Sequence, residues 1–448
     1  MEKDTIVANA TPLMPSAVSI IRISGNKAFE IGKKLTNKKE NIKERTAYFS
    51  KILDRNNEII DEGIVLFFKS PKSFTGEDVV EIQTHGSVPV VKKIISEAIY
   101  YGARFAEPGE FTKRAFLHGK IDLTQAEAIA QLIEAQSEKA SKAAVNILEG
   151  KLHKKVQQLK NKLMEVVSLI EAELNFPEDV EELDFNLIKL NLNEVLQNIE
   201  GLIKTYKKGE LIREGIKLAI VGKPNVGKSS LFNSFVGYER AIVSDIEGTT
   251  RDFIEESLMI KGIPVKLLDT AGIRETKDKI ESLGIKLAKD KIKEADIIIF
   301  VFDVSEGITK EDLEIYEEIK DKNPIIVGNK IDLHLDKINE KYYFKDIIFL
   351  SSKTLQGFDQ LENEISKRLG LLEFQDEEIY INLRHFEILK QAENKLKNVL
   401  DNLQNYEEFK EILILEIQEI ENLLKEIIGE ITTEDILGNI FANFCIGK

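Results

Sequence analysis

The stretch "GKPNVGKSS", from Gly222 to Ser230, contains residue types that bind nucleotide phosphates. It fits the pattern G-x-x-x-x-G-K-[ST], follows the apolar run "IKLAIVG" and precedes the helical segment "SLFNSFVG". Glycines permit a tight loop whose N–H groups point at phosphate oxygens, and the helix N-terminus adds positive charge. We expect Lys228 to reach the β and γ phosphates and Ser229 to hold Mg²⁺. A glycine-rich turn without this function is the alternative, and the flanking strand and helix argue against it.

Two further stretches follow in the order expected of a nucleotide hydrolase. "IEGTTRD" supplies Thr249 and Thr250 between the loop helix and the next strand. "LLDTAG" places Asp269 at a strand end, where a carboxylate can anchor the water shell of the metal. It also places Gly272 where a backbone N–H can meet the γ-phosphate. We therefore expect Mg²⁺ to be held by Ser229 and Thr250.

A base-recognition motif completes the set. "GNKID" supplies Asn329, Lys330 and Asp332, and a carboxylate there can accept both edge hydrogens of guanine. Adenine lacks the second donor, so a buried Asp would discriminate strongly against it. "SSKTLQG", with Ser352 and Lys353, is similar to the last guanine-contacting loop of Ras-like GTPases. Together the motifs predict a Ras-like P-loop GTPase domain that binds GTP.

The predicted nucleotide-binding residues form one set along the chain. They are Asn225, Val226, Gly227, Lys228, Ser229, Ser230, Ser244, Asp245, Ile246, Glu247, Gly248, Thr249, Thr250, Asp269, Thr270, Ala271, Gly272, Asn329, Lys330, Asp332, Ser352 and Lys353. One departure concerns the attacking water, which many such GTPases orient with a glutamine after "DTAG". Ile273 stands there, so either hydrolysis is slow and partner-dependent or another group orients the water. Arg251 and Arg274 are nearby, but neither identifies itself as an arginine finger.

Three kinds of segment must position these residues. Residues 1 to 118 combine strand runs such as "AVSIIRIS" and "DVVEIQTHG" with the helical "SVPVVKKIISEAIYYG", which predicts an α+β domain. From Thr124 a helical pattern continues to about Pro177, broken at most near Gly150, and another runs to Gly209. Two more helical patterns follow residue 380. Between them, "IKLAIVG", "VKLLDT", "ADIIIFVFD", "NPIIVGN" and "DIIFLSS" alternate with helix-length segments, as in a parallel α/β sheet.

We interpret the helical segments as one discontinuous helical domain interrupted by the GTPase domain; a coiled coil or two separate bundles are the alternatives. The predicted domains are an N-terminal α+β domain at 1–118, the first helical part at 119–209, the G domain at 210–375 and the second helical part at 376–448. The formal net charge of -15 argues against non-specific coating of nucleic acid. The single cysteine, the lack of a secretory signal and the lack of an 18-residue apolar run predict a cytoplasmic protein without a membrane span.

The whole chain resembles the MnmE (TrmE) family. The resemblance is carried by the Asn225 phosphate loop, "SDIEGTTRD", "DTAGIRE", "DTIVANATP", "IIRISG", "SFTGEDVVEIQTHGS", "GEFTKRAFLHGKIDLTQAEAIA" and "TTEDILGNIFANFCIGK". It implies a homodimer formed through the N-terminal domain, which would bind a tetrahydrofolate derivative in its 5-formyl or methylene form. It also implies a heterotetramer with the flavoprotein MnmG. That complex would install an aminomethyl or carboxymethylaminomethyl group on carbon 5 of the wobble uridine of certain tRNAs.

The resemblance also implies a folate site. The family positions that contact folate correspond to Arg22, Glu81, Lys120 and the terminal Lys448. A carboxylate can accept the donors of a pterin, and cations suit its glutamate tail. The loop "LMPSAVS" departs from the glycine-rich loop usual in the family and leaves its backbone conformation open. Cys445, in the tail "FCIGK", is either a nucleophilic or redox thiol of the modification step or a small apolar residue packed between its neighbours.

The resemblance further implies potassium-dependent catalysis. Asn225 matches the family position that coordinates a potassium ion, and Ser244, Ile246 and Thr249 would complete its shell. The ion would stand where an arginine finger stands in other systems. Glu281 matches the family's water-orienting glutamate. The predicted catalytic residues are therefore Glu281, Lys228, Asn225 and Cys445.

Two other functions remain open from the sequence. One is a regulatory GTPase switch for ribosome or membrane assembly with helical arms and no folate chemistry. The other is a helical scaffold with a vestigial phosphate loop, against which the complete set of nucleotide motifs argues. The N-terminal domain discriminates between enzyme and switch, because a switch has no need of Arg22, Glu81 or Lys120.

Overall fold

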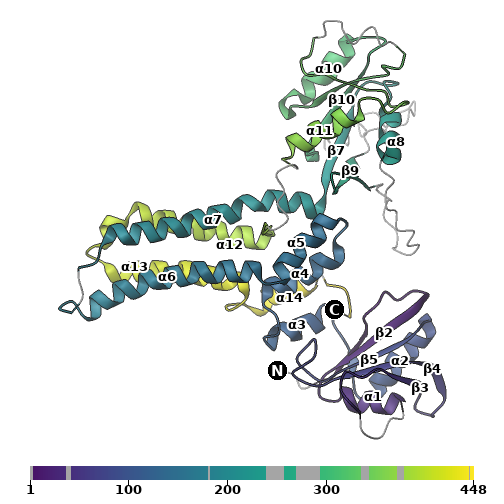
Figure 1. The fold of residues 1–448 in the computed structure, drawn as a ribbon, viewed down its shortest axis with the longest axis vertical. Helices are drawn as coiled ribbons and strands as arrows, with labels where there is room; N and C mark the ends of the chain where they lie inside the picture. The colour runs from purple at the N-terminus through teal and green to yellow at the C-terminus, as the bar shows by residue number, and fades with distance from the viewer. Residues whose placement is uncertain are drawn as a thin grey trace, which may run out of the picture. The chain divides into compact units, whose positions relative to one another are not determined.

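The computed structural model describes the chain in eight stretches (Figure 1). These are residues 4–36, 42–179, 182–238, 257–268, 293–333, 343–370, 378–442 and 444–447. The chain divides into two compact units. The first contains Met1–Ile133, Ala144–Ile203 and Leu383–Lys448, and the second contains Glu134–Ala143 and Lys204–Asn382. In the described residues, no helix is both long and apolar enough to cross a membrane.

The first unit begins with a six-stranded sheet in the order β3-β4-β5-β2-β1-β6. Its strands are β1 (Ile6–Asn9), β2 (Ser16–Ser24), β3 (Tyr48–Leu53), β4 (Ile59–Phe68), β5 (Val79–Gly86) and β6 (Arg104–Phe105). Helices α1 (Ala28–Thr36) and α2 (Val88–Tyr100) share a buried apolar cluster with alternate residues of β2, β4 and β5. Because successive strand residues face opposite sides, Arg22 and Glu81 lie on the face away from this cluster.

Helices make up the rest of the first unit. They are α3 (Glu110–Leu117), α4 (Leu123–Glu134), α5 (Glu138–Leu148), α6 (Lys151–Asn175), α7 (Phe185–Glu214), α12 (Leu383–Asp401), α13 (Lys410–Ile428) and α14 (Glu434–Ala442). A short 3-10 helix, Leu403–Tyr406, precedes α13. Helix α13 packs against both α6 and α12, so helices from before and after the second unit pack together (Figure 1). Helices α5 and α7 each continue into residues of the second unit.

Two helix boundaries differ from the sequence-based expectation. The helical pattern after Thr124 is interrupted at residues 135–137 as well as near Gly150. Ser137 causes the extra break, because its hydroxyl accepts the backbone N–H of Ala140 at 3.1 Å and so caps the start of α5. Helix α7 does not end at Gly209 but continues to Glu214. Gly215 ends it with a φ of 81°, where a Cβ would lie 2.7 Å from the Pro264 carbonyl oxygen.

A buried ion cluster joins the two helical parts of the first unit. The Glu127 carboxylate on α4 accepts Arg384 Nε at 2.7 Å and Arg384 Nη2 at 2.8 Å, and it contacts His385 Nε2 at 2.8 Å. Arg384 also donates to the carbonyl oxygens of Glu426 and Ile427, at the end of α13. Burial alone would raise the pKa of Glu127, but the attraction of His385 and the bonds from Arg384 hold it far below its ordinary value.

The second unit contains a six-stranded sheet in the order β12-β11-β10-β7-β9-β8. Its strands are β7 (Ile216–Val221), β8 (Ser257–Ile260), β9 (Ile263–Leu268), β10 (Ile297–Asp303), β11 (Ile325–Asn329) and β12 (Ile348–Phe349). Its helices include α8 (Lys228–Tyr238), α10 (Lys310–Ile319), the 3-10 turn Lys320–Lys322 and α11 (Phe358–Arg368). All paired strands are parallel except β8 and β9. The strands predicted from the five apolar runs of this region are confirmed.

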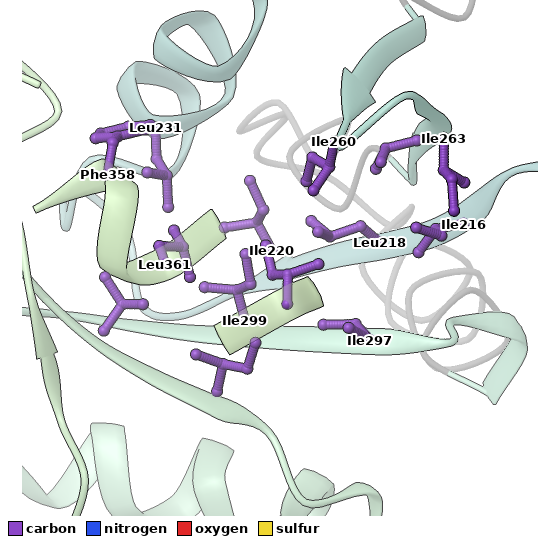
Figure 2. Packing of buried hydrophobic residues seen from close by; sticks show 14 of the residues in the cluster. Ile216, Leu218, Ile220, Leu231, Ile260, Ile263, Ile297, Ile299, Phe358 and Leu361 are labelled. Atoms are coloured by element: carbon purple, nitrogen blue, oxygen red, sulfur yellow. The ribbon is translucent and has the colours of Figure 1, made fainter. Parts of the chain in front are cut away.

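Apolar side chains cover both faces of this sheet. Figure 2 shows the larger cluster, which contains Ile216, Leu218, Ile220, Ile297, Ile299, Leu231 of α8, and Phe358 and Leu361 of α11. The alternate residues Ala219, Ile298 and Phe300 belong to a second cluster with residues of α10. Burial on both faces explains the continuous apolar run of β10. Since the carboxyl ends of parallel strands meet at one sheet edge, the loops after β7, β10, β11 and β12 converge there.

We predict that Arg384→Met destabilises the first unit by about 3–5 kcal/mol near neutral pH, because Glu127 would stay buried without its guanidinium partner. Hydrogen exchange of the α4 and α12 amides, followed by mass spectrometry, measures this loss of stability as faster exchange. The deficit should shrink as the pH falls toward 4, because a protonated Glu127 needs no cation. Lys395→Met is the matched control, since it removes the exposed Lys395–Glu419 ion pair between α12 and α13 and should change little. Equal exchange in the two variants would contradict the prediction.

Candidate functional site

The phosphate loop lies between β7 and α8, as its motif predicts. Two of its residues adopt left-handed backbone conformations, Asn225 with a φ of 64° and Gly227 with a φ of 97°. A Cβ on Gly227 would lie 2.3 Å from the Asn329 side-chain nitrogen, so only glycine permits this close approach. The loop is therefore shaped by the base-recognition motif as well as by its own sequence.

Lys228 begins α8 and turns its ammonium group back into the loop. Its Nζ donates to the carbonyl oxygens of Gly222 and Lys223, both at 2.7 Å. Burial lowers the pKa of Lys228. The amine is thus held by two carbonyl groups of the predicted phosphate loop. Ser229, the predicted Mg²⁺ ligand, follows it on the first turn of the helix.

A cavity of about 570 Å³ adjoins the loop. It is lined by Gly227, Ser230, Asn233, Ser234, Asn329, Lys330, Asp332, Leu333, Ser352 and Lys353. The lining comes from the phosphate loop, α8 and the loops after β11 and β12. The fold therefore assembles the predicted phosphate loop and the two predicted guanine-binding segments, which are far apart in the sequence, around one space.

Asn329 holds this site together. Its side-chain nitrogen donates to the Val226 carbonyl oxygen at 2.9 Å, and its Oδ1 accepts the backbone N–H and the hydroxyl of Ser352 at 3.1 and 3.0 Å. The residue is 1% exposed. The asparagine thus connects the phosphate loop, β11 and the last predicted guanine loop, and it fixes the two loops relative to each other.

Lys330 and Asp332 are each fixed by a residue that the sequence analysis missed. Lys330 Nζ donates to the Asn225 carbonyl oxygen at 2.8 Å and to Asp303 Oδ2 at 2.6 Å. Burial alone would raise the pKa of Asp303, but the bonds from Lys330 and Ser305 and the charge of Lys330 together lower it. Asp332 Oδ1 accepts the hydroxyl of buried Ser351 at 2.6 Å. The carboxylate at the end of "ADIIIFVFD" was a usable signal, because strand ends converge on the nucleotide site.

Other predicted site residues lie outside the described residues. These are Ser244, Asp245, Ile246, Glu247, Gly248, Thr249, Thr250, Asp269, Thr270, Ala271, Gly272, Glu281 and Lys448, together with Ile273, Arg251 and Arg274. Of the predicted metal ligands, Ser229 and Asn225 are described. The described stretches contain no group of three or more His, Cys, Asp or Glu residues arranged to hold a metal ion. The predicted magnesium and potassium ligands are hydroxyl, amide and carbonyl oxygens, a different kind of site.

The second predicted site lies on the N-terminal sheet. Arg22 of β2 faces Glu81 of β5 across the strand pair, and Arg22 Nε donates to Glu81 Oε1 at 2.9 Å. The guanidinium carbon also lies 5.2 Å from the centroid of the Phe74 ring and 5.6 Å from that of Phe111. Both charged side chains are partly exposed. A carboxylate, a guanidinium and an aromatic ring therefore meet on the face opposite α1 and α2.

The loop between β4 and β5 connects this pair to Lys120. Lys120 Nζ donates to the Pro71 carbonyl oxygen at 3.0 Å, and Phe74, a few residues further along the loop, contacts Arg22. Arg22 and Lys120, the two cations predicted to bind folate, thus contact the same short loop. Lys120 also lines a separate cavity of about 370 Å³ with residues of the α3–α4 loop and the start of α6.

The C-terminal tail reaches the same sheet. Ile446 forms an antiparallel bridge with Pro108, and Gly447 packs so closely on β1 that a Cβ would lie 2.1 Å from the Asn9 carbonyl oxygen. Asn9 is next along β1 to Ala8, the strand partner of Arg22. Cys445 is exposed. The structure therefore contradicts the alternative in which Cys445 is a small apolar residue packed between its neighbours, because Phe444 is buried whereas Cys445 and Ile446 are exposed.

Family models and full-length relatives both match this chain. The family model described as the MnmE helical domain matches residues 123–445, and that of the GTP-binding protein TrmE N-terminus matches residues 5–120. The tRNA modification GTPase MnmE of Aquifex aeolicus (strain VF5) is 48% identical over 447 residues, covering 100% of both chains. Its namesake from Clostridioides difficile (strain 630) is 42% identical over 99% of each chain.

A solved structure is similar over part of the chain. A crystal structure of Era in complex with MgGDPNP and a segment of 16S ribosomal RNA is 37% identical, covering 34% of this chain and 56% of that one. Its TM-score of 0.26 is too low to bear on the fold. The assignment rests instead on the family models and the full-length relatives, which confirm the resemblance carried by the motifs. The chain belongs to the MnmE family of tRNA modification GTPases.

Proposed function

We propose that this chain is a potassium-stimulated GTPase that modifies carbon 5 of the wobble uridine of certain tRNAs. It would act as a homodimer in the cytoplasm with the flavoprotein MnmG and use a tetrahydrofolate one-carbon unit to install an aminomethyl or carboxymethylaminomethyl group. The observation that carries the proposal is the cavity shared by the phosphate loop and the two guanine motifs, in a chain that aligns end to end with tRNA modification GTPases. The domain division predicted from the sequence is part of this proposal.

Each predicted site residue would have a specific role in binding or hydrolysing GTP. Asp332, oriented by Ser351, would accept the two edge hydrogens of guanine. Lys228 would neutralise charge on the β and γ phosphates, while Ser229 and Thr250 would hold Mg²⁺. Asn225, with Ser244, Ile246 and Thr249, would hold potassium, whose charge lowers the energy of the transition state. Glu281 would orient the attacking water through an intervening water. The left-handed Asn225 is held in place by Lys330, which fits a fixed ligand position.

The N-terminal sheet supports a reduced folate as the second ligand. Glu81 would accept the donors of the pterin ring and Arg22 would lie beside it, while the exposed edge of Phe74 offers an aromatic surface. Lys120 and the terminal Lys448 would meet the glutamate tail. Bound folate would supply the one-carbon unit. Exposed Cys445, one residue before the Ile446 bridge, would be an accessible thiol for the modification step.

Nucleoside analysis of tRNA tests the function as a whole. We expect tRNA from a strain lacking this protein to lose the C5-modified wobble uridine, and a plasmid-borne wild-type copy to restore it. Lys228→Ala should fail to restore it, because the phosphate contact of the catalytic lysine is lost. Unchanged nucleosides in the deletion strain would refute the proposal and favour the regulatory switch.

Potassium dependence tests the hydrolysis mechanism. We expect the GTPase rate in potassium chloride to exceed that in sodium chloride at matched ionic strength by on the order of tenfold or more, because the ion stabilises transition-state charge. Asn225→Ala should remove this difference. Glu281→Ala should lower kcat and spare nucleotide affinity, which isothermal titration with GDP would measure. Equal wild-type rates in the two salts would rule the potassium mechanism out, and full activity of Glu281→Ala would remove that residue from it.

The tail provides a test of the folate site. Gly447→Ala should weaken binding of 5-formyltetrahydrofolate by about tenfold or more, because the added Cβ cannot fit against the Asn9 carbonyl and the tail must move. GTP affinity should not change, because the phosphate loop is in the other unit. Gly438→Ala on α14 is the matched control, since its Cβ would meet nothing within 4 Å. Calorimetry that finds equal folate affinity in both variants would argue against a role for the tail.

A further inference from the structure

Lys223 is buried although it belongs to the phosphate loop. Its side chain is only 9% exposed and is directed toward the start of α10. The ammonium nitrogen lies 2.7 Å from Glu306 Oε2, 3.4 Å from Asp312 Oδ2 and 3.5 Å from the Thr309 hydroxyl. Burial alone would lower the pKa of Lys223, but the bond from Glu306 and the charge of Asp312 raise it, so the side chain stays charged. Glu306 and Asp312 thus form an acidic clamp that holds Lys223, the second residue of the loop.

The acidic clamp is itself fixed in the fold. Thr309 and Asp312 form a capping box at the start of α10, in which Asp312 Oδ2 accepts the Thr309 backbone N–H at 2.9 Å and its hydroxyl at 2.6 Å. Asp312 is fully buried, and its other oxygen has no hydrogen-bond partner within the described part of the chain. Lys223 is therefore the cation that compensates this buried carboxylate. Breaking the contact would be costly, so the loop and α10 hold each other in place.

The same segment also holds the far side of the loop. Asp303, at the end of β10, binds Lys330, which donates to the carbonyl oxygen of left-handed Asn225. The residues from Asp303 to Asp312 thus anchor the phosphate loop at two points, at residue 223 and at residue 225. Each anchor is a lysine held by a carboxylate. Two anchors fix the direction of the carbonyl groups between them more firmly than one.

The first anchor has a direct connection to the catalytic lysine. Lys228 Nζ donates to the carbonyl oxygen of Lys223 itself at 2.7 Å and to that of Gly222 at the same distance. The side chain of Lys223 is clamped by acids, while its backbone carbonyl receives the ammonium group of Lys228. Any rotation of the peptide at residue 223 would therefore move the charge that must meet the γ-phosphate.

We propose that Lys223 is a positioning residue for GTP hydrolysis, which acts by fixing the peptide that holds Lys228. The proposal rests on GTP hydrolysis at this loop. The ammonium group of Lys223 is paired with Glu306 and Asp312, so the side chain acts on the loop and not on the nucleotide directly. Small displacements of a catalytic group lower the rate of the chemical step far more than they lower ground-state binding. Loss of the clamp should therefore lower kcat and leave KM nearly unchanged.

Steady-state GTPase kinetics of Lys223→Met test this. The change keeps the length of the side chain and removes its charge, and we expect kcat to fall by about tenfold or more with KM within about threefold of the wild type. Lys223→Arg should recover most of kcat, because it keeps the cation. Lys320→Met is the matched control, since it removes the exposed Lys320–Glu317 ion pair at the other end of α10 and should behave as wild type.

A second variant keeps the proposal testable if Lys223→Met does not fold. Glu306→Gln removes one acid of the clamp from an exposed position, so the fold should tolerate it, and kcat should fall by about threefold with unchanged KM and GDP affinity. Wild-type kcat in either variant, or equal losses of kcat and nucleotide affinity, would overturn the proposal. A wild-type protein that does not hydrolyse GTP would instead refute the GTPase assignment.

Discussion

The buried carboxylate of Glu127 imposes the constraint on which the helical architecture depends. A carboxylate at this depth is tolerated only with charged or hydrogen-bonding partners beside it, and these are Arg384 and His385, more than 250 residues later. The same Arg384 satisfies carbonyl groups at the end of α13. The first unit therefore cannot be completed until the chain has passed through the whole second unit. The second unit can be inserted at this point of the sequence because the helical parts before and after it pack against each other.

The C-terminal segment likewise packs against the N-terminal part of the chain, beside the sheet. Phe444 is buried with α4 and α14, Ile446 bridges to Pro108, and Gly447 lies against the end of β1. Strand β1 pairs with the strand that carries Arg22. The last residues of the chain thus come to lie beside a site built from its first hundred. This proximity places the exposed Cys445 near the N-terminal sheet, which its position in the sequence alone does not explain.

The nucleotide site depends on paired lysines and carboxylates rather than on the glycines alone. Glycines allow the loop to turn, but Lys223 and Lys330 determine where its carbonyl groups point. Asn329 then connects the loop to the base-recognition segments. The residues proposed for base recognition, cation binding and phosphate binding therefore share one hydrogen-bonded framework. A substitution at one of these contacts is expected to change the free-energy contributions of the others, since neighbouring groups in one network do not contribute additively.

The sequence by itself determined the strands of the nucleotide sheet, the phosphate loop and the family, because these depend on local patterns: apolar runs of strand length and motifs of fixed spacing. It also allowed prediction of the Arg22–Glu81 pair as one site, through motif resemblance. Only the tertiary structure decided that Asp303, Ser351 and Lys223 support the nucleotide site, that Ser137 divides the helical pattern, and that α7 continues to Glu214. Ser137 acts locally, through the backbone N–H of Ala140, but the other outcomes depend on a partner or a packing surface farther away in the sequence. Asp303 acts through Lys330, Lys223 through Asp312, and Gly215 ends α7 where Pro264 leaves no room for a side chain. Spacing along the chain cannot reveal such partners.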